Sequence, residues 1–281
     1  MKVSRILADA TRLLAANGVN EPRLQAASLL AFALGRDRTF LIAHPEFEPA
    51  SDEALRFSGL LSRRANREPY QYIVGCQEFY GLDFEVTSDV LIPRPETEIL
   101  VENAIARLCK IESPRFCEIG VGSGCILVSV LKNVESASAF GVDISENVLT
   151  IAAKNAEKHR VANRLELRVS DIYSAIPTAR FDAILSNPPY VPVGDIASLQ
   201  PEVGSFEPHT ALTDGGDGLS LIRRVINGAP DFLASGGFLM IEIGFGQSES
   251  VGLMLGCEIW QSVEVVDDLE GIPRTTIAIR R

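Results

Sequence analysis

The chain has 281 residues and a net charge of −11, and its composition of 46% hydrophobic and 22% charged residues is that of an ordinary globular protein. This length accommodates one large domain or a large and a small one. The acidic balance argues against a nucleic-acid backbone as the main partner, because phosphates need a cationic surface. No apolar stretch is long enough to span a bilayer, and residues 1–18 carry charges within a helical pattern, unlike a signal peptide. Scattered single cysteines without a CxxC pair predict a reduced cytoplasmic protein that has no metal site: Cys76, Cys109, Cys117, Cys125 and Cys257.

The first part of the chain has apolar residues at helical spacing as far as about Tyr72. Gly18 and Gly35 follow two such runs, and Pro22 suits the first turn of the second run. Another helix is expected from Ser51 onward. We therefore predict a small all-α domain over residues 1–73.

The pattern changes after residue 73. The short runs QEFYG and LDFEV meet near Gly81 and predict a β-hairpin, which we take as a linker over residues 74–93.

From residue 94 to residue 281, strand-like and helix-like runs alternate, which predicts a doubly wound, mostly parallel α/β sheet. The seven expected strands are RFCEIG, SAFGVD, LELRVS, FDAILS, GFLMIEIG, SVEVVDD and TTIAIR. No helix separates the last two runs, so we expect that pair to be antiparallel. Residues 188–218 show little regular pattern, and because loops of that length are usually functional we expect them to help cover a bound substrate.

A glycine loop follows the first of these strands. Gly120, Gly122 and Gly124 allow a tight turn and a close approach of the backbone to a ligand, although a purely structural turn has the same composition. Cys125 stands where a dinucleotide-binding fingerprint needs glycine, which disfavours NAD. The spacing E-x-G-x-G-x-G resembles the first motif of class I S-adenosylmethionine-dependent methyltransferases.

Acidic residues end the next two strands. Asp143 is placed to accept both hydrogen bonds of a ribose diol, and it is also a candidate N-cap for the following helix. Asp171 and Ile172 stand where such methyltransferases hold the adenine, with the carboxylate accepting from the amino group and the apolar side chain against the ring. A turn aspartate is the alternative interpretation of Asp171.

The tetrapeptide Asn187-Pro188-Pro189-Tyr190 ends the fourth strand. An acceptor NH₂ group can donate one hydrogen bond to the Asn187 side-chain oxygen and one to the Pro188 carbonyl, while Tyr190 stacks on the flat group. This arrangement contains no strong acid or base, which suits transfer of an already activated methyl group. The sequence therefore predicts methyl transfer to a planar nitrogen, against the alternative of a simple turn.

Longer blocks of the sequence distinguish between the possible methyl acceptors. RRANREPYQYIVGCQEFYGLDFEVTSDVLIPRPETEILVE, EIGVGSGCI, SNPPYV and FEPHTALTDGGDGL closely resemble the peptide-chain release factor glutamine-N5 methyltransferases, the HemK/PrmC family. The resemblance runs from about Leu60 to Ile243. It implies a class I methyltransferase Rossmann-like fold, S-adenosyl-L-methionine as cofactor, and methylation of the glutamine in the GGQ motif of class 1 release factors.

Carried over by position, the resemblance implies cofactor-binding residues Gly120, Val121, Gly122, Ser123, Gly124, Asp143, Asp171, Ile172 and Asn187. It also implies that Asn187, Pro188, Pro189 and Tyr190 hold the glutamine, with Asn187, Pro188 and Tyr190 as the catalytic residues. Two positions depart from the pattern, since His209 stands where relatives commonly have arginine and Ile172 where some have tryptophan. We interpret His209 as a surface residue and not as a base.

Two groups of arginines remain. Arg94 is expected to steady a nearby loop or the cofactor carboxylate. Arg56, Arg63, Arg64 and Arg67 are expected to form a solvated helix face, or else to dock an acidic partner surface.

Three rival functions stay open at this point. One is a glutamine methyltransferase that acts on a ribosomal protein, and the second is a DNA adenine-N6 methyltransferase, which the charge and the lack of a target-recognition domain disfavour. The third is a binding module that has kept the fold without turnover.

Overall fold

The computed structural model describes residues 1–177 and 180–281. The chain divides into two compact units. The first comprises Met1–Cys76 together with Gln200–Phe206, and the second comprises Gln77–Leu199 and Glu207–Arg281. The structure thus differs from the expected division at residues 200–206, which lie with the helical unit.

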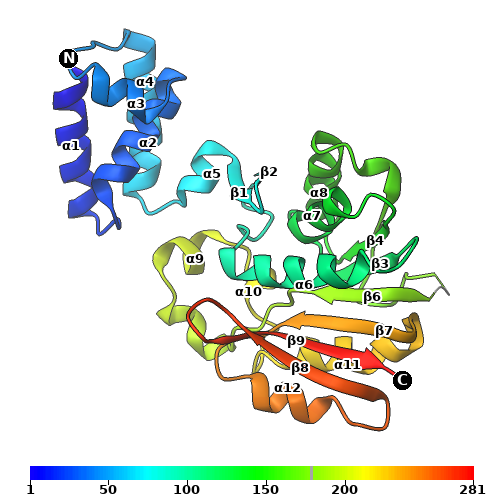
Figure 1. Cartoon of the computed structure of the whole chain (residues 1–281). Helices are drawn as coiled ribbons and strands as arrows, with labels where there is room; N and C mark the ends of the chain where they lie inside the picture. The colour runs from blue at the N-terminus through cyan, green and yellow to red at the C-terminus, as the bar shows by residue number, and fades with distance from the viewer. Residues whose placement is uncertain (178–179) are drawn as a thin grey trace. The chain divides into compact units, whose positions relative to one another are not determined.

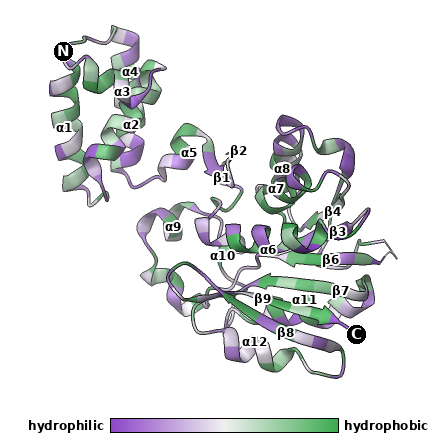
Figure 2. Cartoon of the chain, in the orientation of Figure 1, coloured by the Kyte–Doolittle hydropathy of each residue, from purple (hydrophilic) through white to green (hydrophobic). Residues whose placement is uncertain are grey.

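The first unit is all-helical, and its elements are α1 Val3–Ala16, α2 Pro22–Leu34, α3 Arg38–Ala43, α4 Ser51–Ala65, α5 Tyr70–Val74 and α9 Pro201–Phe206. Hydrophobic and hydrophilic residues alternate around α1, as Figure 2 shows. The buried face of α1 carries Val3, Ile6, Ala10 and Leu14 at helical spacing. These side chains form one apolar core with α2 and with Phe57 of α4.

The arginines of α4 explain why residues 200–206 belong to this unit. Arg64 is only 4% exposed, and its guanidinium donates to Glu202 Oε1 at 2.8 Å and to Gln25 Oε1 at 2.9 Å. Arg67 donates to both carboxylate oxygens of Glu202. The prediction of a solvated arginine face is therefore wrong for Arg64. A buried guanidinium needs a carboxylate partner, and here that partner is 138 residues away in the chain.

The second unit begins with the predicted hairpin, formed by β1 Cys76–Phe79 and β2 Leu82–Glu85. Its apolar side chains Phe79 and Phe84 are buried in the same core as the helices that cover the large sheet. The hairpin is thus more than a linker, because it packs into the core of the second unit.

The large sheet has seven strands in the order β5-β4-β3-β6-β7-β9-β8 (Figure 1). The strands are β3 Arg115–Ile119, β4 Ser138–Asp143, β5 Leu165–Val169, β6 Phe181–Ser186, β7 Leu233–Glu242, β8 Trp260–Asp267 and β9 Pro273–Arg280. All neighbours up to β7 pair in parallel, whereas β9 pairs antiparallel with both β7 and β8. The predicted seven-stranded, doubly wound sheet and its antiparallel final pair are confirmed.

Helices cover both faces of this sheet, because successive side chains of a buried strand point to opposite sides and need apolar cover on each. Phe116 contributes to the core shared with α6 and α7, and Cys117 to the core shared with α11. The helices are η1 Pro95–Thr97, α6 Glu98–Leu108, α7 Cys125–Asn133, α8 Glu146–Lys158, η2 Ala162–Arg164, η3 Val193–Ser198, α10 His209–Leu212, α11 Ser220–Phe232 and α12 Ser248–Met254.

The segment 188–218 is more regular than predicted, since it contains η3, α9 and α10. Each of these helices has six residues or fewer, which is too short to give a recognisable apolar period in the sequence.

Candidate active site

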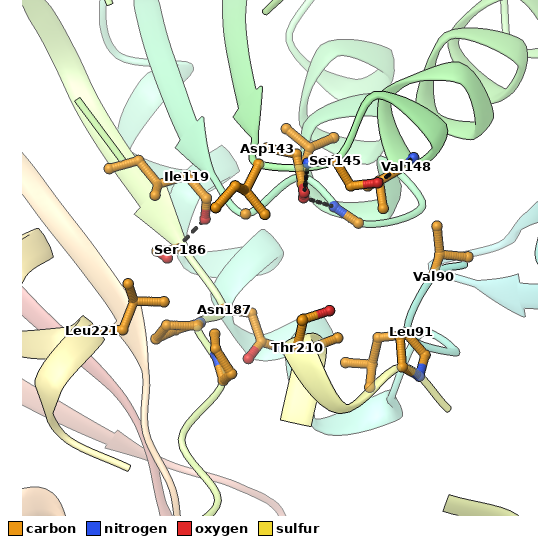
Figure 3. Close-up of a pocket in the computed structure, with 18 of the residues that line it drawn as sticks. Val90, Leu91, Ile119, Asp143, Ser145, Val148, Ser186, Asn187, Thr210 and Leu221 are labelled. Carbon is orange, nitrogen blue, oxygen red and sulfur yellow. Dashed lines mark hydrogen bonds between the residues drawn. The ribbon is translucent and has the colours of Figure 1, made fainter. Parts of the chain in front are cut away.

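The strand order reverses next to β3, because β4 and β5 lie on one side of it and β6 and β7 on the other. Ligands of open α/β sheets bind beyond the carboxyl ends of the strands at such a switch point. A cavity of about 510 Å³ lies there, within the range of roughly 300–1,000 Å³ that is usual for small-molecule sites. Figure 3 shows Asp143, Asn187 and Thr210 among the residues around it.

The glycine loop forms one wall of this cavity. Gly120, Val121, Gly122 and Ser123 line it, and Gly120 and Gly122 have φ angles of 76° and 56°, where a Cβ atom is strained. Gly124 does not line the cavity. A Cβ atom there would lie 3.2 Å from the Cβ of Ala152, so Gly124 instead lets α7 and α8 approach each other closely.

Asp143 stands at the end of β4 and lines the same cavity. One carboxylate oxygen accepts from the N–H of Gly122 at 3.2 Å and the other from the N–H of Ser145 at 3.1 Å. Burial raises the pKa of Asp143, while these hydrogen bonds oppose the rise. The N-cap of α8 is Ser145, whose hydroxyl accepts from Val148, so Asp143 is not the helix cap.

Asp171 and Ile172 also line the cavity. Asp171 is exposed and its carboxylate accepts from Arg224 at 2.7 Å. Ile172 is buried with a φ of 54°, a conformation that costs a β-branched residue about 1–3 kcal/mol. The hydroxyl of Ser170 donates to the Ile172 carbonyl at 2.9 Å and so holds this strained backbone. Strain that the surrounding structure maintains in this way is frequent at ligand sites.

Glu118, the first residue of the E-x-G-x-G-x-G spacing, is buried beneath the glycine loop and lines the cavity. Its Oε2 accepts from the N–H of Leu127 at 2.9 Å, and its Oε1 has no hydrogen-bond partner within residues 1–177 and 180–281. Burial raises the pKa of this carboxyl well above its usual range. A cationic ligand group would satisfy the unpaired oxygen. The ammonium group of S-adenosylmethionine fits this requirement.

Asn187, Pro188 and Pro189 form another part of the cavity wall. The Asn187 side-chain nitrogen donates to the hydroxyl of Thr97 at 3.1 Å. This bond fixes the amide so that its oxygen remains available as an acceptor. We call residues 187–190, which are predicted to hold the methyl-accepting group, the acceptor segment. The structure thus brings the first three residues of the acceptor segment to the cavity that holds the glycine loop and Asp143.

Tyr190 does not line the cavity. Its hydroxyl donates to Glu242 at 3.2 Å, and its backbone carbonyl accepts from the side chain of Gln247 at 3.0 Å. A Cβ atom on Gly218, whose φ is 78°, would lie 2.1 Å from the same carbonyl. Contacts with Glu242, Gln247 and Gly218 therefore fix Tyr190 in place. Its ring can stack on the substrate amide, as predicted, only if the Tyr190 side chain moves.

The DGGDGL loop is organised by Asp214, another cavity residue. Burial opposes the ionisation of Asp214, but hydrogen bonds from the hydroxyl and N–H of Ser220 and from the N–H groups of Gly216 and Gly218 lower its pKa to about 2. Because these donors occupy its oxygens, Asp214 orders the loop around Gly218.

Arg94 pairs with Glu207, which is buried and also accepts from the N–H of Ile92 at 3.2 Å. This confirms the first of the two roles expected for Arg94, since Glu207 immediately precedes Pro208, a cavity residue. His209 is exposed at the start of α10 and does not line the cavity.

Sequence reasoning missed several residues that support the site. Asn155 of α8 is fully buried, and its amide exchanges hydrogen bonds with the backbone of Glu85 in the hairpin and donates to the carbonyl of Ser123 at 2.8 Å. Its one sequence signal is a polar residue among the apolar positions of α8. Thr97 and Glu242 gave no signal, because their contacts come from distant parts of the chain.

No helix in residues 1–177 and 180–281 has the length and apolar character needed to cross a membrane. Within the same residues there is no group of three or more histidine, cysteine, aspartate or glutamate side chains suited to a metal ion.

Comparison of the fold with solved structures gives methyltransferases. A methyltransferase from Pyrococcus furiosus covers 78% of this chain and 98% of its own, with a TM-score of 0.54 and 19% identity. The hMettl16 catalytic domain in complex with the MAT2A 3′UTR hairpin 6 covers 80% of this chain and 81% of its own, with a TM-score of 0.57 and 15% identity. At these identities the likeness shows the fold alone.

Sequence comparison is more specific. The family model described as PrmC N-terminal domain matches residues 5–75, and that described as Methyltransferase small domain matches residues 95–198. A release factor glutamine methyltransferase of Geobacter sulfurreducens is 44% identical over 88% of this chain and 86% of its own length. One from Koribacter versatilis is 40% identical over 99% of this chain and 98% of its own length. The chain belongs to the release factor glutamine methyltransferase family.

Proposed function

We propose that the enzyme transfers a methyl group from S-adenosyl-L-methionine to the side-chain amide nitrogen (N5) of the glutamine in the GGQ motif of class 1 peptide chain release factors. Membership of the family confirms the predicted enzyme class and its cofactor. The roles of individual residues in the following paragraphs are part of the proposal.

In this proposal the cofactor lies along the ends of β3, β4 and β5. The backbone of residues 120–123 accommodates its methionine part and Asp143 accepts from its ribose. Ile172 packs against its adenine, and the exposed Asp171 accepts from the adenine amino group with the oxygen that Arg224 leaves free. When bound, the cofactor supplies a methyl group activated by a positively charged sulfur.

The observation that carries the proposal is the position of Asn187-Pro188-Pro189 in the same cavity as the glycine loop and Asp143. Asn187 Oδ1 and the Pro188 carbonyl accept the two N–H groups of the glutamine amide. Where these bonds disfavour a planar nitrogen, they reduce the delocalisation of its lone pair and aim it at the methyl carbon. Geometry of this kind contributes up to roughly 7–11 kcal/mol in intramolecular models. After transfer, the cationic amide loses a proton to water, so no strong base is needed.

The partner is proposed to be recognised by the predicted helical domain, residues 1–73, while the second unit receives the glutamine. We further propose that the enzyme works in the cytoplasm, where release factors act, and that it binds neither DNA directly nor a membrane. The net charge of −11 and five free cysteines support this part of the proposal.

A methyl-transfer assay tests the substrate. Purified enzyme is incubated with methyl-labelled S-adenosylmethionine and, in separate reactions, with a bacterial class 1 release factor, its Gln→Ala variant at the GGQ motif, ribosomal proteins and duplex DNA. Label is expected in the wild-type factor alone, and mass spectrometry should place it on the glutamine. Label in a ribosomal protein or in DNA, with none in the release factor, would replace the proposed substrate.

Asn187→Ala tests the acceptor site. Loss of the accepting oxygen is expected to lower kcat by at least about 100-fold, because an amide held by one hydrogen bond is poorly aligned. The Kd of S-adenosylmethionine, measured by calorimetry, should change by much less. Equal losses in both quantities would mean that Asn187 serves the cofactor and that the acceptor assignment is incorrect.

A further inference from the structure

Glu242 is a buried carboxyl group that the proposed reaction does not use. It is the last residue of β7, is 1% exposed, and lies behind the acceptor segment. It accepts from the hydroxyl of Tyr190 at 3.2 Å, and the hydroxyl of Thr97 interacts with the same carboxyl and opposes the rise of its pKa. Its Oε2 has no hydrogen-bond partner in the part of the chain that the structure describes. A buried carboxyl with one unpaired oxygen is costly, so its retention calls for an explanation.

The hydrogen-bond directions around Glu242 lead to Asn187. Above a pH of about 7 Glu242 is ionised and only accepts, so the hydroxyl of Thr97 donates its single proton to Glu242. The oxygen of Thr97 must then accept its other bond, which comes from Asn187 at 3.1 Å. The group of Asn187 that faces Thr97 is therefore the NH₂ group, and Oδ1 is turned toward the substrate amide.

We propose that Glu242 is a positioning residue that sets the orientation of the Asn187 amide through Thr97, so that an acceptor and not a donor faces the substrate nitrogen. The inference rests on the proposed role of Asn187. Without the carboxylate, Thr97 is free to donate to Asn187 Oδ1, and the amide then presents its NH₂ group to the substrate NH₂ group. Two donors facing each other cannot hold the glutamine.

The charges that surround Glu242 make this control sensitive to pH. The pKa of Glu242 is raised to about 7, mainly by burial and also by the negative charge of Glu96. Interactions with the hydroxyls of Thr97 and Tyr190 and the positive charge of Arg274 oppose this rise. Arg274 is paired with Asp268, and Cys125 of α7 is the further titratable group that interacts with Glu242. A protonated Glu242 can itself donate to Thr97 and reverse the relay. Turnover is therefore expected to fall as the pH drops through about 7.

Three variants separate this role from a packing role. Thr97→Val removes the hydroxyl, and Glu242→Gln replaces a group that only accepts with one whose NH₂ group can donate to Thr97, each with little change of volume. Thr276→Val is the matched control, because Thr276 is also a buried threonine, 2% exposed, and its hydroxyl has no partner in residues 1–177 and 180–281. Glu242→Gln should remain folded at pH 8. A carboxyl whose pKa is raised by folding lowers stability above that pKa, and the glutamine removes this cost.

The test measures kcat and KM for a class 1 release factor, the Kd of S-adenosylmethionine, and kcat from pH 6 to 8. Thr97→Val and Glu242→Gln are expected to lower kcat about 10- to 100-fold, the effect of one misplaced hydrogen bond, with KM and Kd within about threefold of wild type. Thr276→Val should keep the wild-type kcat. The decrease of kcat at low pH should disappear in Glu242→Gln.

The double variant Thr97→Val/Glu242→Gln should be no slower than the slower single variant, because both changes interrupt one relay. Wild-type kcat in both single variants, combined with an inactive Asn187→Ala, would overturn the inference and leave the proposed function standing. Losses of kcat that multiply in the double variant would also overturn the inference, and so would a pH profile of kcat that is the same in Glu242→Gln as in the wild type. An active Asn187→Ala would instead remove the proposed function of that residue.

Discussion

The two sides of the cavity are built differently. On the cofactor side, Asp143 holds Gly122 and Ser145, which lie 21 and 2 residues away in the sequence. On the acceptor side, Asn187 is held by Thr97 at a separation of 90 residues, and Tyr190 by Glu242 at a separation of 52. Asp143 and the glycine loop thus depend mainly on strand ends and their own loops, whereas Asn187 and Tyr190 depend on side chains that only the complete fold brings together.

This difference predicts how each side fails. A change on the cofactor side should weaken cofactor binding, because the glycine loop and the carboxyl groups of Glu118, Asp143 and Asp171 form that wall. A change in the supports of the acceptor side should slow turnover while the cofactor still binds. Separate measurement of Kd for the cofactor and of kcat therefore reveals which side a residue serves.

The largest effect is expected for Gly218→Ala. The new Cβ atom would lie 2.1 Å from the Tyr190 carbonyl, so the loop or the acceptor segment must move. We expect kcat to fall by more than about 100-fold, since displacements of about 1 Å have effects of that size. The Kd of S-adenosylmethionine should stay within a few-fold of wild type.

Gly215→Ala is the control for this prediction. Gly215 has the same φ of 78°, but its Cβ atom would have no neighbour within 4 Å. Both variants carry the same backbone penalty, of roughly 1–2 kcal/mol, and only Gly218→Ala carries the clash. Equal losses of turnover in the two variants would attribute the effect to backbone strain and would contradict the role assigned to the Tyr190 contact.

Asp143→Asn, on the cofactor side of the cavity, is expected to have the next largest effect. The asparagine keeps one accepting oxygen, but it loses the charge and one of the bonds to Gly122 and Ser145. Charged hydrogen bonds contribute about 1.5–3 kcal/mol, so the Kd of S-adenosylmethionine should rise about 10- to 100-fold. At saturating cofactor, kcat should recover most of its wild-type value. A low kcat that saturation does not restore would mean that Asp143 also orients the reaction.

The contrast also explains what the sequence could predict. The fold class, the strand ends and the cavity residues Gly120, Gly122, Asp143 and Asn187 followed from local patterns, because each lies at the end of a recognisable strand. Gly124 carries the same pattern and yet packs against Ala152, since a motif does not distinguish ligand contact from helix packing.

Long-range contacts account for what the sequence did not predict. Tyr190 turns its hydroxyl to Glu242, and no local signal connects two residues on different elements. Arg64 looked like part of an exposed face because its partner Glu202 comes from a helix too short to recognise. In both cases a polar side chain is buried and its partner lies far away in the sequence, and such pairs are specified by the fold as a whole.

The smallest effect on turnover, but a measurable effect on stability, is expected for Glu202→Gln in the helical unit. Burial opposes the ionisation of Glu202, but hydrogen bonds from Arg67 and Arg64 lower its pKa to about 2. A carboxylate whose pKa is lowered by folding stabilises the protein above its ordinary pKa, and this contribution is lost as the pH falls toward the lowered value. At pH 7 the variant should therefore be less stable by about 1–3 kcal/mol, because the buried Arg64 loses its charged partner. The difference should shrink between about pH 4.5 and 2.

Hydrogen exchange of α4 at pH 7 and at pH 3 measures this change of stability locally. Glu68→Gln is a suitable control, because Glu68 accepts from Arg63, a more exposed arginine of α4.

The effect on turnover should be small. Residues 200–206 belong to the helical unit but lie in the sequence between two stretches of the second unit, and Glu207, the next residue, pairs with Arg94. Glu202 is thus connected along the chain to Glu207 and the cavity residue Pro208. We expect kcat to fall by no more than about threefold, well below the loss for Gly218→Ala, because an effect carried along the backbone is weaker than a direct clash at Tyr190. A loss as large as that of Gly218→Ala would mean that the acceptor side is organised from the helical unit and not from β7 and the loop around Gly218.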